Sequence, residues 1–246
     1  MPVALAVAPH PDDEAYPFGG LLALLAGAGW RCFVLAATLG EAGERHDGAC
    51  GEPLAMVRAR ELREACRLLG AEPPLLWRLP DGGLAGLPSR GEELARLVAE
   101  LGAELLLSLG PDGAYGHPDH VAAHRWTREA SERSGTALLE AVFAPRLFLP
   151  QYERCRSAGV LGDPPLLAPD QLGSGSCDIV LQLTPTLRSR KRAAIAAHRS
   201  QLPGGEPEAL FPRGIVEALL DRESYAIVQG GPAVDAVRRL VRSLGA

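Results

Sequence analysis

Short apolar runs alternate with longer helical patterns along most of this 246-residue chain, and this alternation constrains its fold more than any other feature. Such alternation is typical of βα repeats, which build a largely parallel sheet. Val3–Ala8 is apolar throughout, which predicts a strand buried on both faces. The expected strands are residues 3–8, 32–38, 75–78, 104–109, 138–143, 178–183 and 225–228. The expected helices are residues 19–28, 52–69, 92–101, 117–133, 185–199 and 233–244. We therefore expect an α/β fold with a mostly parallel, twisted sheet flanked by helices.

Residues 144–177 interrupt this pattern with a stretch rich in proline and glycine. The stretch is long for a connection, and two interpretations stay open: a lid or binding loop, or an ordinary surface insertion. Elsewhere we find no internal repeat and no shift in composition that would mark a boundary. We therefore expect residues 1–246 to form a single domain with a loop insertion near 144–177.

Composition narrows the class of partner. The 25 basic and 30 acidic residues give a net charge of −5, and the basic residues are scattered, which argues against a nucleic-acid groove or a polybasic membrane patch. The apolar stretch 19–40 is interrupted by Gly27, Gly29 and Arg31, so it does not read as a membrane span. The N-terminus lacks the features of a cleaved signal peptide. We expect a small-molecule partner, with no nucleic acid and no membrane.

The cysteines are odd in number and include no C-x-x-C pair, which suggests neither a disulfide framework nor a cysteine-type zinc site. They are Cys32, Cys50, Cys66, Cys155 and Cys177. A reducing cytoplasm fits this pattern best.

Two loops rich in histidine and carboxylate follow expected strands. Residues 9–14 come directly after the first strand, and residues 110–120 come after the strand at 104–109. Parallel α/β sheets bind ligands outside the carboxyl ends of their strands, so the two loops converge if their strands are neighbours. Adjacent carboxylates repel one another, and a bound cation would offset that repulsion. Imidazole and carboxylate without thiolate suit a zinc ion with an open catalytic position.

Each loop also has a simpler interpretation. Residues 10–14 alone are compatible with a solvated turn, and residues 117–120 alone are compatible with a helix N-cap in which Asp119 suits the helix dipole. His124 lies one helical turn after His120 and could be a second ligand, although core packing or a salt bridge suits it better. The basic run at 188–192 is typical of a solvated helix face.

Several motifs, in this order, resemble the LmbE-like family, also called the PIG-L deacetylases, which are zinc-dependent enzymes that remove an N-acetyl group from glucosamine-containing compounds. The motifs are Ala8–Glu14 (APHPDDE), Gly19-Gly20, Thr38–Glu44 (TLGEAGE) and Gly116–His120 (GHPDH). Further segments that look like family features are Arg58–Leu62, Asp81–Gly83 and His198–Gln201. The resemblance covers most of the chain apart from 144–177, and it implies a Rossmann-like fold.

The resemblance also implies a role for individual residues. It implies one Zn²⁺ per chain, with the ligands His10, Asp13 and His120. It makes Asp12 the general base, and it makes His117 the group that stabilises charge and protonates the leaving amine. Asp119 would orient His117, and Tyr115 would help to bind the oxyanion. These roles suit amide hydrolysis, because a metal lowers the pKa of bound water from 15.7 towards about 7.

Two further matches and one departure concern the substrate. Arg58 and Asp81 match positions that contact sugar hydroxyls in relatives, although a salt-bridged helix face and a turn carboxylate are simpler interpretations. Where many relatives have small or polar residues, this chain has the bulky segment 15–18 (Ala-Tyr-Pro-Phe). Tyr16 and Phe18 could form a hydrophobic wall for a non-sugar part of the substrate, or pack beneath the following helix.

We therefore expect a cytoplasmic, zinc-dependent hydrolase that removes an N-acetyl group from an N-acetylglucosamine-containing small molecule or conjugate. A metal-dependent phosphoesterase is an alternative, because clustered histidine and aspartate also serve two-metal hydrolysis. A second alternative is a non-catalytic, Rossmann-like binding module. Against it, the first strand-to-helix turn lacks G-x-G-x-x-G, and its acidic residues would repel a pyrophosphate. The sequence does not define the aglycone, and it leaves a homo-oligomer open.

Overall fold

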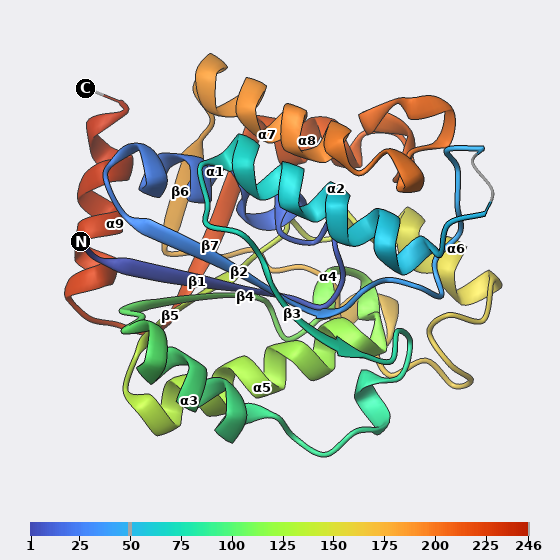
Figure 1. The fold of residues 1–246 in the computed structure, drawn as a ribbon, viewed down its shortest axis with the longest axis horizontal. Helices are drawn as coiled ribbons and strands as arrows, with labels where there is room; N and C mark the ends of the chain where they lie inside the picture. Colours follow the sequence, from blue (N-terminus) through green and yellow to red (C-terminus); the bar gives the residue numbers. More distant parts are fainter. Residues whose placement is uncertain (49–50, 246) are drawn as a thin grey trace.

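The computed structural model describes residues 1–48 and 51–245, so Cys50 lies outside the described residues. Seven strands form one sheet in the order β3-β2-β1-β4-β5-β7-β6 (Figure 1). The strands are β1 (Val3–Ala8), β2 (Arg31–Thr38), β3 (Leu75–Leu79), β4 (Leu105–Leu109), β5 (Ala137–Ala141), β6 (Ile179–Gln182) and β7 (Arg222–Gln229). The first five pair in parallel, whereas β7 pairs antiparallel with both β5 and β6. The expectation of a mostly parallel sheet is confirmed, with an antiparallel pairing added at one edge.

Helices cover both faces of the sheet. In Figure 1, α1, α2, α7 and α8 lie above the sheet, and α3 and α5 lie below it. The helices are α1 (Ala15–Gly27), α2 (Leu54–Leu69), α3 (Gly91–Leu101), α4 (Gly113–Gly116), α5 (Pro118–Ser134), α6 (Leu149–Ser157), α7 (Pro185–Ala197), α8 (Ile215–Asp221) and α9 (Pro232–Ser243). Short 3₁₀ turns are η1 (Leu84–Gly86), η2 (Pro169–Gln171), η3 (Arg199–Gln201), η4 (Pro203–Gly205) and η5 (Pro207–Ala209). None of the described helices is long and apolar enough to cross a bilayer.

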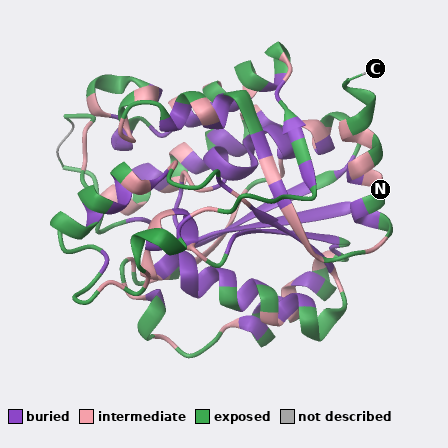
Figure 2. Ribbon diagram, turned by 180° about the vertical axis from the view of Figure 1, so that it is seen from behind, coloured by how far each residue is buried: buried purple, intermediate pink, exposed green. Residues whose placement is uncertain are grey.

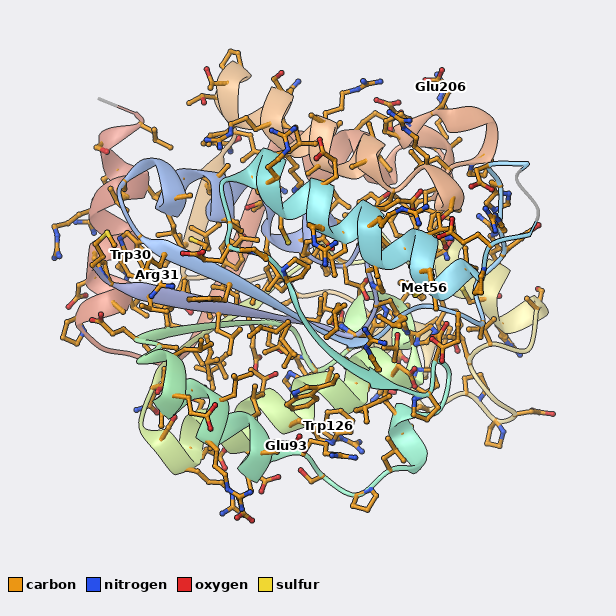
Figure 3. All side chains as sticks on the ribbon, in the orientation of Figure 1. Trp30, Arg31, Met56, Glu93, Trp126 and Glu206 are labelled. Atoms are coloured by element: carbon orange, nitrogen blue, oxygen red, sulfur yellow. The ribbon has the colours of Figure 1, made fainter. Side chains whose placement is uncertain are left out.

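The sheet and the inner faces of the helices form the core. Every residue of β1, β4 and β5 is buried, as expected for strands covered on both faces (Figure 2). Trp126 of α5, which is labelled in Figure 3, is buried on the side of the sheet that α3 and α5 cover. Its ring lies 6.4 Å from that of Trp77 on β3. The two aromatic side chains pack α5 against the β3 edge of the sheet.

Four helical segments differ from the sequence-based prediction, one of them the single turn α4, which lies in the expected loop after β4. Helix α1 begins at Ala15 instead of residue 19, because the bulky residues 15–18 continue the apolar surface of the helix into the core. Helices α6 and α8 were not predicted. Both are short, and α6 lies within the segment whose prolines and glycines obscure any helical period.

A buried ion pair joins α7 to β7 beside α1. Lys191 Nζ lies 2.6 Å from Glu223 Oε1, and both side chains are inaccessible to solvent. The same carboxylate accepts a hydrogen bond of 2.7 Å from the main-chain N–H of Gly20 in α1. A Cβ at this position would clash with Leu183 Cδ2 and would lie 3.0 Å from the Glu223 carboxylate, so glycine lets the helix approach the strand here. The prediction that the basic run 188–192 is a solvated face is therefore wrong for Lys191. Its partner, Glu223, lies on a strand far along the chain, and the pattern of residues around Lys191 does not indicate that contact.

Candidate metal-dependent active site

Strands β1 and β4 are direct neighbours, so the two polar loops that follow them meet at one point. Strand β1 pairs in parallel with β2 on one side and β4 on the other, which makes this the place where strand order reverses. A crevice at such a switch point is the usual ligand site of an open α/β sheet. A cavity of about 520 Å³ opens there. Its lining includes every residue predicted for the site, namely His10, Asp12, Asp13, Arg58, Asp81, Tyr115, His117, Asp119 and His120.

Three imidazole rings converge on the floor of this cavity. The ring centroids of His10 and His117 lie 5.0 Å apart, those of His10 and His120 lie 5.2 Å apart, and those of His117 and His120 lie 4.7 Å apart. Each of the three offers a ring nitrogen within 4.8 Å of the other two. Nitrogen donors this close can share one metal ion.

His120 has the hydrogen-bonding state of a metal ligand. Its Nδ1 lies 3.1 Å from the carbonyl oxygen of Gly113, and a carbonyl only accepts, so Nδ1 carries a proton. Burial lowers the pKa of His120, which favours the neutral ring with the lone pair on Nε2. His120 Nε2 is buried and has no hydrogen-bond partner within the described part of the chain. It lies 3.4 Å from Asp13 Oδ2. A second hydrogen bond that fixes the ring and its tautomer is typical of histidines that bind metals.

The geometry of this loop depends on Gly113. Its φ is +54°, and a Cβ on it would lie 2.9 Å from the Cβ of His120. A side chain at this position would therefore both strain the backbone and displace the imidazole.

His10 lies between carboxylates on both sides. Its Nδ1 donates to Asp13 Oδ2 over 3.0 Å. Its Nε2 lies 3.1 Å from Asp81 Oδ1 and 3.4 Å from Asp119 Oδ2, and these three side chains also offer ligand atoms within 4.8 Å of one another. Asp13 belongs to neither set of three, but its Oδ2 contacts both His10 and His120.

The N-cap interpretation of residues 117–120 is correct and is compatible with the site. His117 caps α5, and its Nδ1 accepts a hydrogen bond of 3.2 Å from the main-chain N–H of Asp119. The Asp119 carboxylate faces the other way, where it accepts from the N–H groups of Gly82 at 2.8 Å and Leu84 at 2.9 Å. The expectation that Asp119 orients His117 agrees with this hydrogen bond, and the group that makes it is the main-chain N–H of Asp119 and not its carboxylate.

The ring of His117 is neutral in this arrangement. Its Nδ1 is an acceptor, so Nε2 carries the proton and is the donor that remains for the cavity. Burial, together with the neighbouring rings of His120 and His10, lowers the pKa of His117 to about 2.

Asp12 has an unusual backbone and a cationic neighbour. Its φ is +119°, a strained conformation for a residue other than glycine, and such strain clusters at functional sites. Its Oδ2 lies 3.2 Å from a guanidinium nitrogen of Arg58, which also donates to the carbonyl oxygens of Pro11 and Gly40. Burial raises the pKa of Asp12 to about 6, although the Arg58 charge acts in the opposite direction. Arg58 is buried and holds this loop in place.

Asp81 is held in place from two directions. Its Oδ2 accepts a hydrogen bond of 2.8 Å from the N–H of Ala42, while its Oδ1 faces His10. Burial opposes ionisation, but the hydrogen bond and charge of His10 outweigh it and lower the pKa of Asp81 to about 2. Asp81 is therefore a carboxylate at neutral pH.

Tyr115 forms part of an aromatic wall. Its ring centroid lies 5.2 Å from that of His120 and is stacked 5.9 Å from that of Phe148. For the bulky segment 15–18, we expected either a wall of the substrate site or packing beneath the helix, and the structure shows one residue in each role. Tyr16 lines the cavity, whereas Phe18 is fully buried in the core beneath α1.

Part of the insertion at 144–177 also lines the cavity. The sequence did not single out the side chains that it contributes, namely Gln151, Arg154, Cys155, Ala158 and Val160. The lining also includes Leu210 and Phe211 from the segment before α8. No sequence signal marks these residues, because their place in the site depends on how α6 and the chain near 210 fold over the sheet. The segment is therefore more than a surface insertion.

His124 lies apart from the metal-compatible sets. Its Nδ1 lies 3.1 Å from the carbonyl oxygen of Leu109 and 3.4 Å from Glu140 Oε1. Of the two alternatives to a ligand role, core packing is confirmed, because His124 is buried and donates to a main-chain carbonyl.

The fold and the site together define a Rossmann-like α/β protein with a histidine and carboxylate cluster at the switch point of its sheet. A family model described as PIG-L, GlcNAc-PI de-N-acetylase, matches residues 5–131. The chain belongs to the PIG-L family, as its motifs indicated.

Named relatives agree with this assignment, and a solved structure has a similar fold. The chain is 32% identical over 228 residues to a 1D-myo-inositol 2-acetamido-2-deoxy-alpha-D-glucopyranoside deacetylase of Corynebacterium diphtheriae, with 81% of this chain and 76% of that protein covered. A protein of the same name from Nocardia farcinica is 32% identical over 279 residues, with 93% and 91% covered. The N,N'-diacetylchitobiose deacetylase of Pyrococcus horikoshii has a TM-score of 0.61 at 23% identity, with 95% of this chain and 88% of that chain covered, and it supports the fold.

Proposed function

We propose that this protein is a zinc-dependent hydrolase that removes the N-acetyl group from an N-acetylglucosamine-containing small molecule. The observation that carries the proposal is the state of His120, whose buried Nε2 has a free lone pair beside His10, His117 and Asp13. The names of the relatives support the same reaction class and an amino-sugar substrate.

The donor set fits zinc. We assign the ligands to His10, Asp13 and His120, because Asp13 Oδ2 lies 3.0 Å from His10 Nδ1 and 3.4 Å from His120 Nε2. Zinc bound through His10 Nδ1 would replace the proton that this nitrogen donates to Asp13. Two ligands of one tetrahedral zinc ion stand roughly 3.3 Å apart, given zinc-to-ligand distances of about 2.0–2.1 Å. Nitrogen and oxygen donors without thiolate are compatible with a catalytic zinc site. A zinc ion held by these residues would supply a water acidic enough to attack at neutral pH and would polarise the amide carbonyl.

Asp12 is the proposed general base. It lies next to the ligand Asp13, and its contact with Arg58 holds its carboxylate at the cavity. Asp12 takes one proton from the attacking water as the new C–O bond forms, and it delivers that proton to the nitrogen as the C–N bond breaks. The products are acetic acid, which loses its proton to solvent to become acetate, and the free amine, and the Asp12 carboxylate is ready for the next cycle.

His117 and Tyr115 are the proposed oxyanion donors. His117 presents Nε2–H to the cavity, since its Nδ1 is already an acceptor, and this N–H can stabilise the negative charge that develops on the carbonyl oxygen. The sequence-based expectation made His117 the proton source for the amine. A neutral imidazole is a poor acid, so we assign that proton to Asp12 instead. Tyr115 packs against the His120 ring and can add a second donor.

The proposal also covers the other residues of the site, the domain organisation and the location in the cell. Asp81 and Arg58 are proposed to contact sugar hydroxyls, because both line the cavity beside the cluster. Asp119 supports His10. We also propose that residues 1–246 act as one domain in which 144–177 forms a wall of the site. A cytoplasmic location is proposed from the cysteine pattern of the sequence.

The test combines metal counting with product analysis. Purified protein is expected to contain one zinc per chain and to release acetate from N-acetylglucosamine conjugates. A chelator should abolish release, and added zinc should restore it. Two metals per chain together with phosphate release from phosphate esters would instead support the phosphoesterase and contradict the proposal.

A further inference from the structure

Two reciprocal hydrogen bonds join the loop after β2 to the turn after β3. The main-chain N–H of Ala42 donates to Asp81 Oδ2 over 2.8 Å, and the main-chain N–H of Asp81 donates to Glu41 Oε1 over 3.0 Å. Strands β2 and β3 pair in parallel, so the motifs Thr38–Glu44 and Asp81–Gly83 follow neighbouring strand ends (Figure 1). Each acidic side chain therefore holds the main chain of the other segment, and the two hydrogen bonds together form a clasp between Glu41 and Asp81.

The clasp determines which oxygen of Asp81 faces His10. Because Oδ2 accepts from Ala42, Oδ1 is the oxygen left for the imidazole, and it lies 3.1 Å from His10 Nε2. The two side chains are largely buried, at 9% exposed for Asp81 and 11% exposed for His10. A carboxylate only accepts, so Nε2 carries the proton that faces Asp81. Nδ1, which faces Asp13, is then the nitrogen that remains for a metal.

Asp119 holds the same turn from the buried side. Its carboxylate accepts from the main-chain N–H groups of Gly82 at 2.8 Å and Leu84 at 2.9 Å. Its Oδ2 lies farther from His10 Nε2 than Asp81 does, at 3.4 Å. The turn that carries Asp81 is therefore fixed on the inside by Asp119 and on the solvent side by Glu41.

Glu41 holds the turn from outside the cavity. The same loop contributes Ala42, Gly43 and Glu44 to the described lining of the cavity, whereas Glu41 is exposed and does not belong to that lining. Its influence on the site therefore passes through the main chain of Asp81 and not through contact with a substrate.

We propose that Asp81 and Glu41 are positioning residues for the metal centre, which together orient the His10 ring so that Nδ1 faces the metal. The inference rests on the zinc site of the proposed function and adds two residues that are not ligands. Loss of a group that holds the second nitrogen of a histidine ligand typically lowers metal affinity by roughly 10–100-fold. Glu41 acts one step farther from the metal, so its loss should cost about the effect of one hydrogen bond.

The dissociation constant for zinc, measured without substrate by competition with a chelating indicator, tests these roles. Asp81→Ala should weaken zinc binding by at least about 10-fold, and Glu41→Ala by roughly 5-fold. In the double variant, Glu41→Ala should add less than about 2-fold to the effect of Asp81→Ala, because its route to His10 is already lost. Wild-type affinity in Glu41→Ala, or a fully additive loss in the double variant, would overturn the inference.

Glu41→Gln separates the hydrogen bond from the charge. The amide oxygen of glutamine still accepts from the Asp81 N–H, so zinc affinity should stay within about 2-fold of the wild type. Glu72→Ala is the surface control, since it removes an exposed carboxylate whose partner is Arg31 at the start of β2. Zinc binding as weak in Glu41→Gln as in Glu41→Ala would assign the effect to charge and contradict the clasp.

Failure of the proposed function would look different. A protein with this order of zinc affinities that releases no acetate from N-acetylglucosamine conjugates would contradict deacetylation and leave the clasp supported. Acetate release with equal zinc affinity in the wild type and all variants would do the reverse. The sugar contact proposed for Asp81 is measured separately, because its loss raises KM and leaves zinc affinity without substrate unchanged.

Discussion

His198 Nε2 donates to Glu14 Oε1 over 2.7 Å, and this buried contact ties the end of α7 to the loop after β1. The other oxygen of Glu14 accepts a hydrogen bond of 2.9 Å from the main-chain N–H of Asp12. A residue late in the chain therefore supports the strained backbone that carries the proposed general base. The His198–Gln201 motif therefore contributes to the site through His198, although none of its residues belongs to the groups that could hold a metal among the described residues.

Replacing His198 should disturb both folding and catalysis. His198→Leu leaves the Glu14 carboxylate buried without its cationic partner, and loss of one member of a buried pair typically costs about 3–5 kcal/mol. We expect a lower free energy of unfolding in urea and a reduced kcat, because the loop at Asp12 loses a support. His46→Leu, on a more exposed histidine, is the control. Unchanged unfolding and unchanged kcat in His198→Leu would show that the contact supports nothing.

The pair of Lys191 and Glu223 should behave as one unit. Lys191→Met leaves the Glu223 carboxylate buried, with only hydrogen bonds to offset its charge, so we expect a loss of about 3–5 kcal/mol. Lys191→Met combined with Glu223→Gln removes both charges and should be more stable than Lys191→Met alone. Denaturant unfolding of the two single variants and the double variant measures this coupling. Strictly additive losses would contradict it.

Glu140 should make stability depend on pH. Burial raises the pKa of its carboxyl from 4.5 to about 7. Between pH 4.5 and pH 7, Glu140 is ionised in the unfolded chain and protonated in the folded protein. The stabilisation that comes from the raised pKa is fully present below about pH 4.5, and it is lost as the pH rises through 7. Glu140→Gln should match the wild type near pH 4.5 and exceed it by about 2–3 kcal/mol at pH 8. Unfolding at both pH values, with Glu153→Gln on the surface as control, checks the difference. An equal advantage at the two pH values would count against the assignment.

Asp12→Asn tests the proposed base. The amide cannot take a proton from water, so kcat should fall by roughly 10²-fold or more, while zinc content stays at one per chain. Acetate release and metal analysis on the same preparation separate the two effects. Asp170→Asn, at an exposed position outside the cavity, is the control. Full activity with bound zinc would remove Asp12 from the mechanism.

The sequence predicted the floor of the site well because its signals are local. The apolar run at Val3–Ala8 and the run ending at Leu109 are short, strongly patterned and followed at once by polar loops, and the structure pairs them side by side. His10 lies two residues after the end of β1, and His117 and His120 lie in the loop and at the helix start that follow β4, so the pairing of β1 with β4 brings the rings together.

Features that depend on tertiary contacts were not predicted. The partners of the Asp119 carboxylate are main-chain N–H groups of Gly82 and Leu84, which carry no residue-specific signal. Lys191 is buried because Glu223 approaches from another strand. Gln151 joins the site through a short helix with a proline in its first turn, within a segment whose composition resembles a loop.

Stepwise addition of zinc to chelator-treated protein tests the central claim most directly, with acetate release from N-acetylglucosaminyl-inositol followed at each step. We predict that the rate rises in proportion to zinc, stops rising at one equivalent per chain, and stays at background in His120→Ala. A rate that is independent of zinc, or that needs two equivalents per chain, would contradict a single zinc centre built on His120.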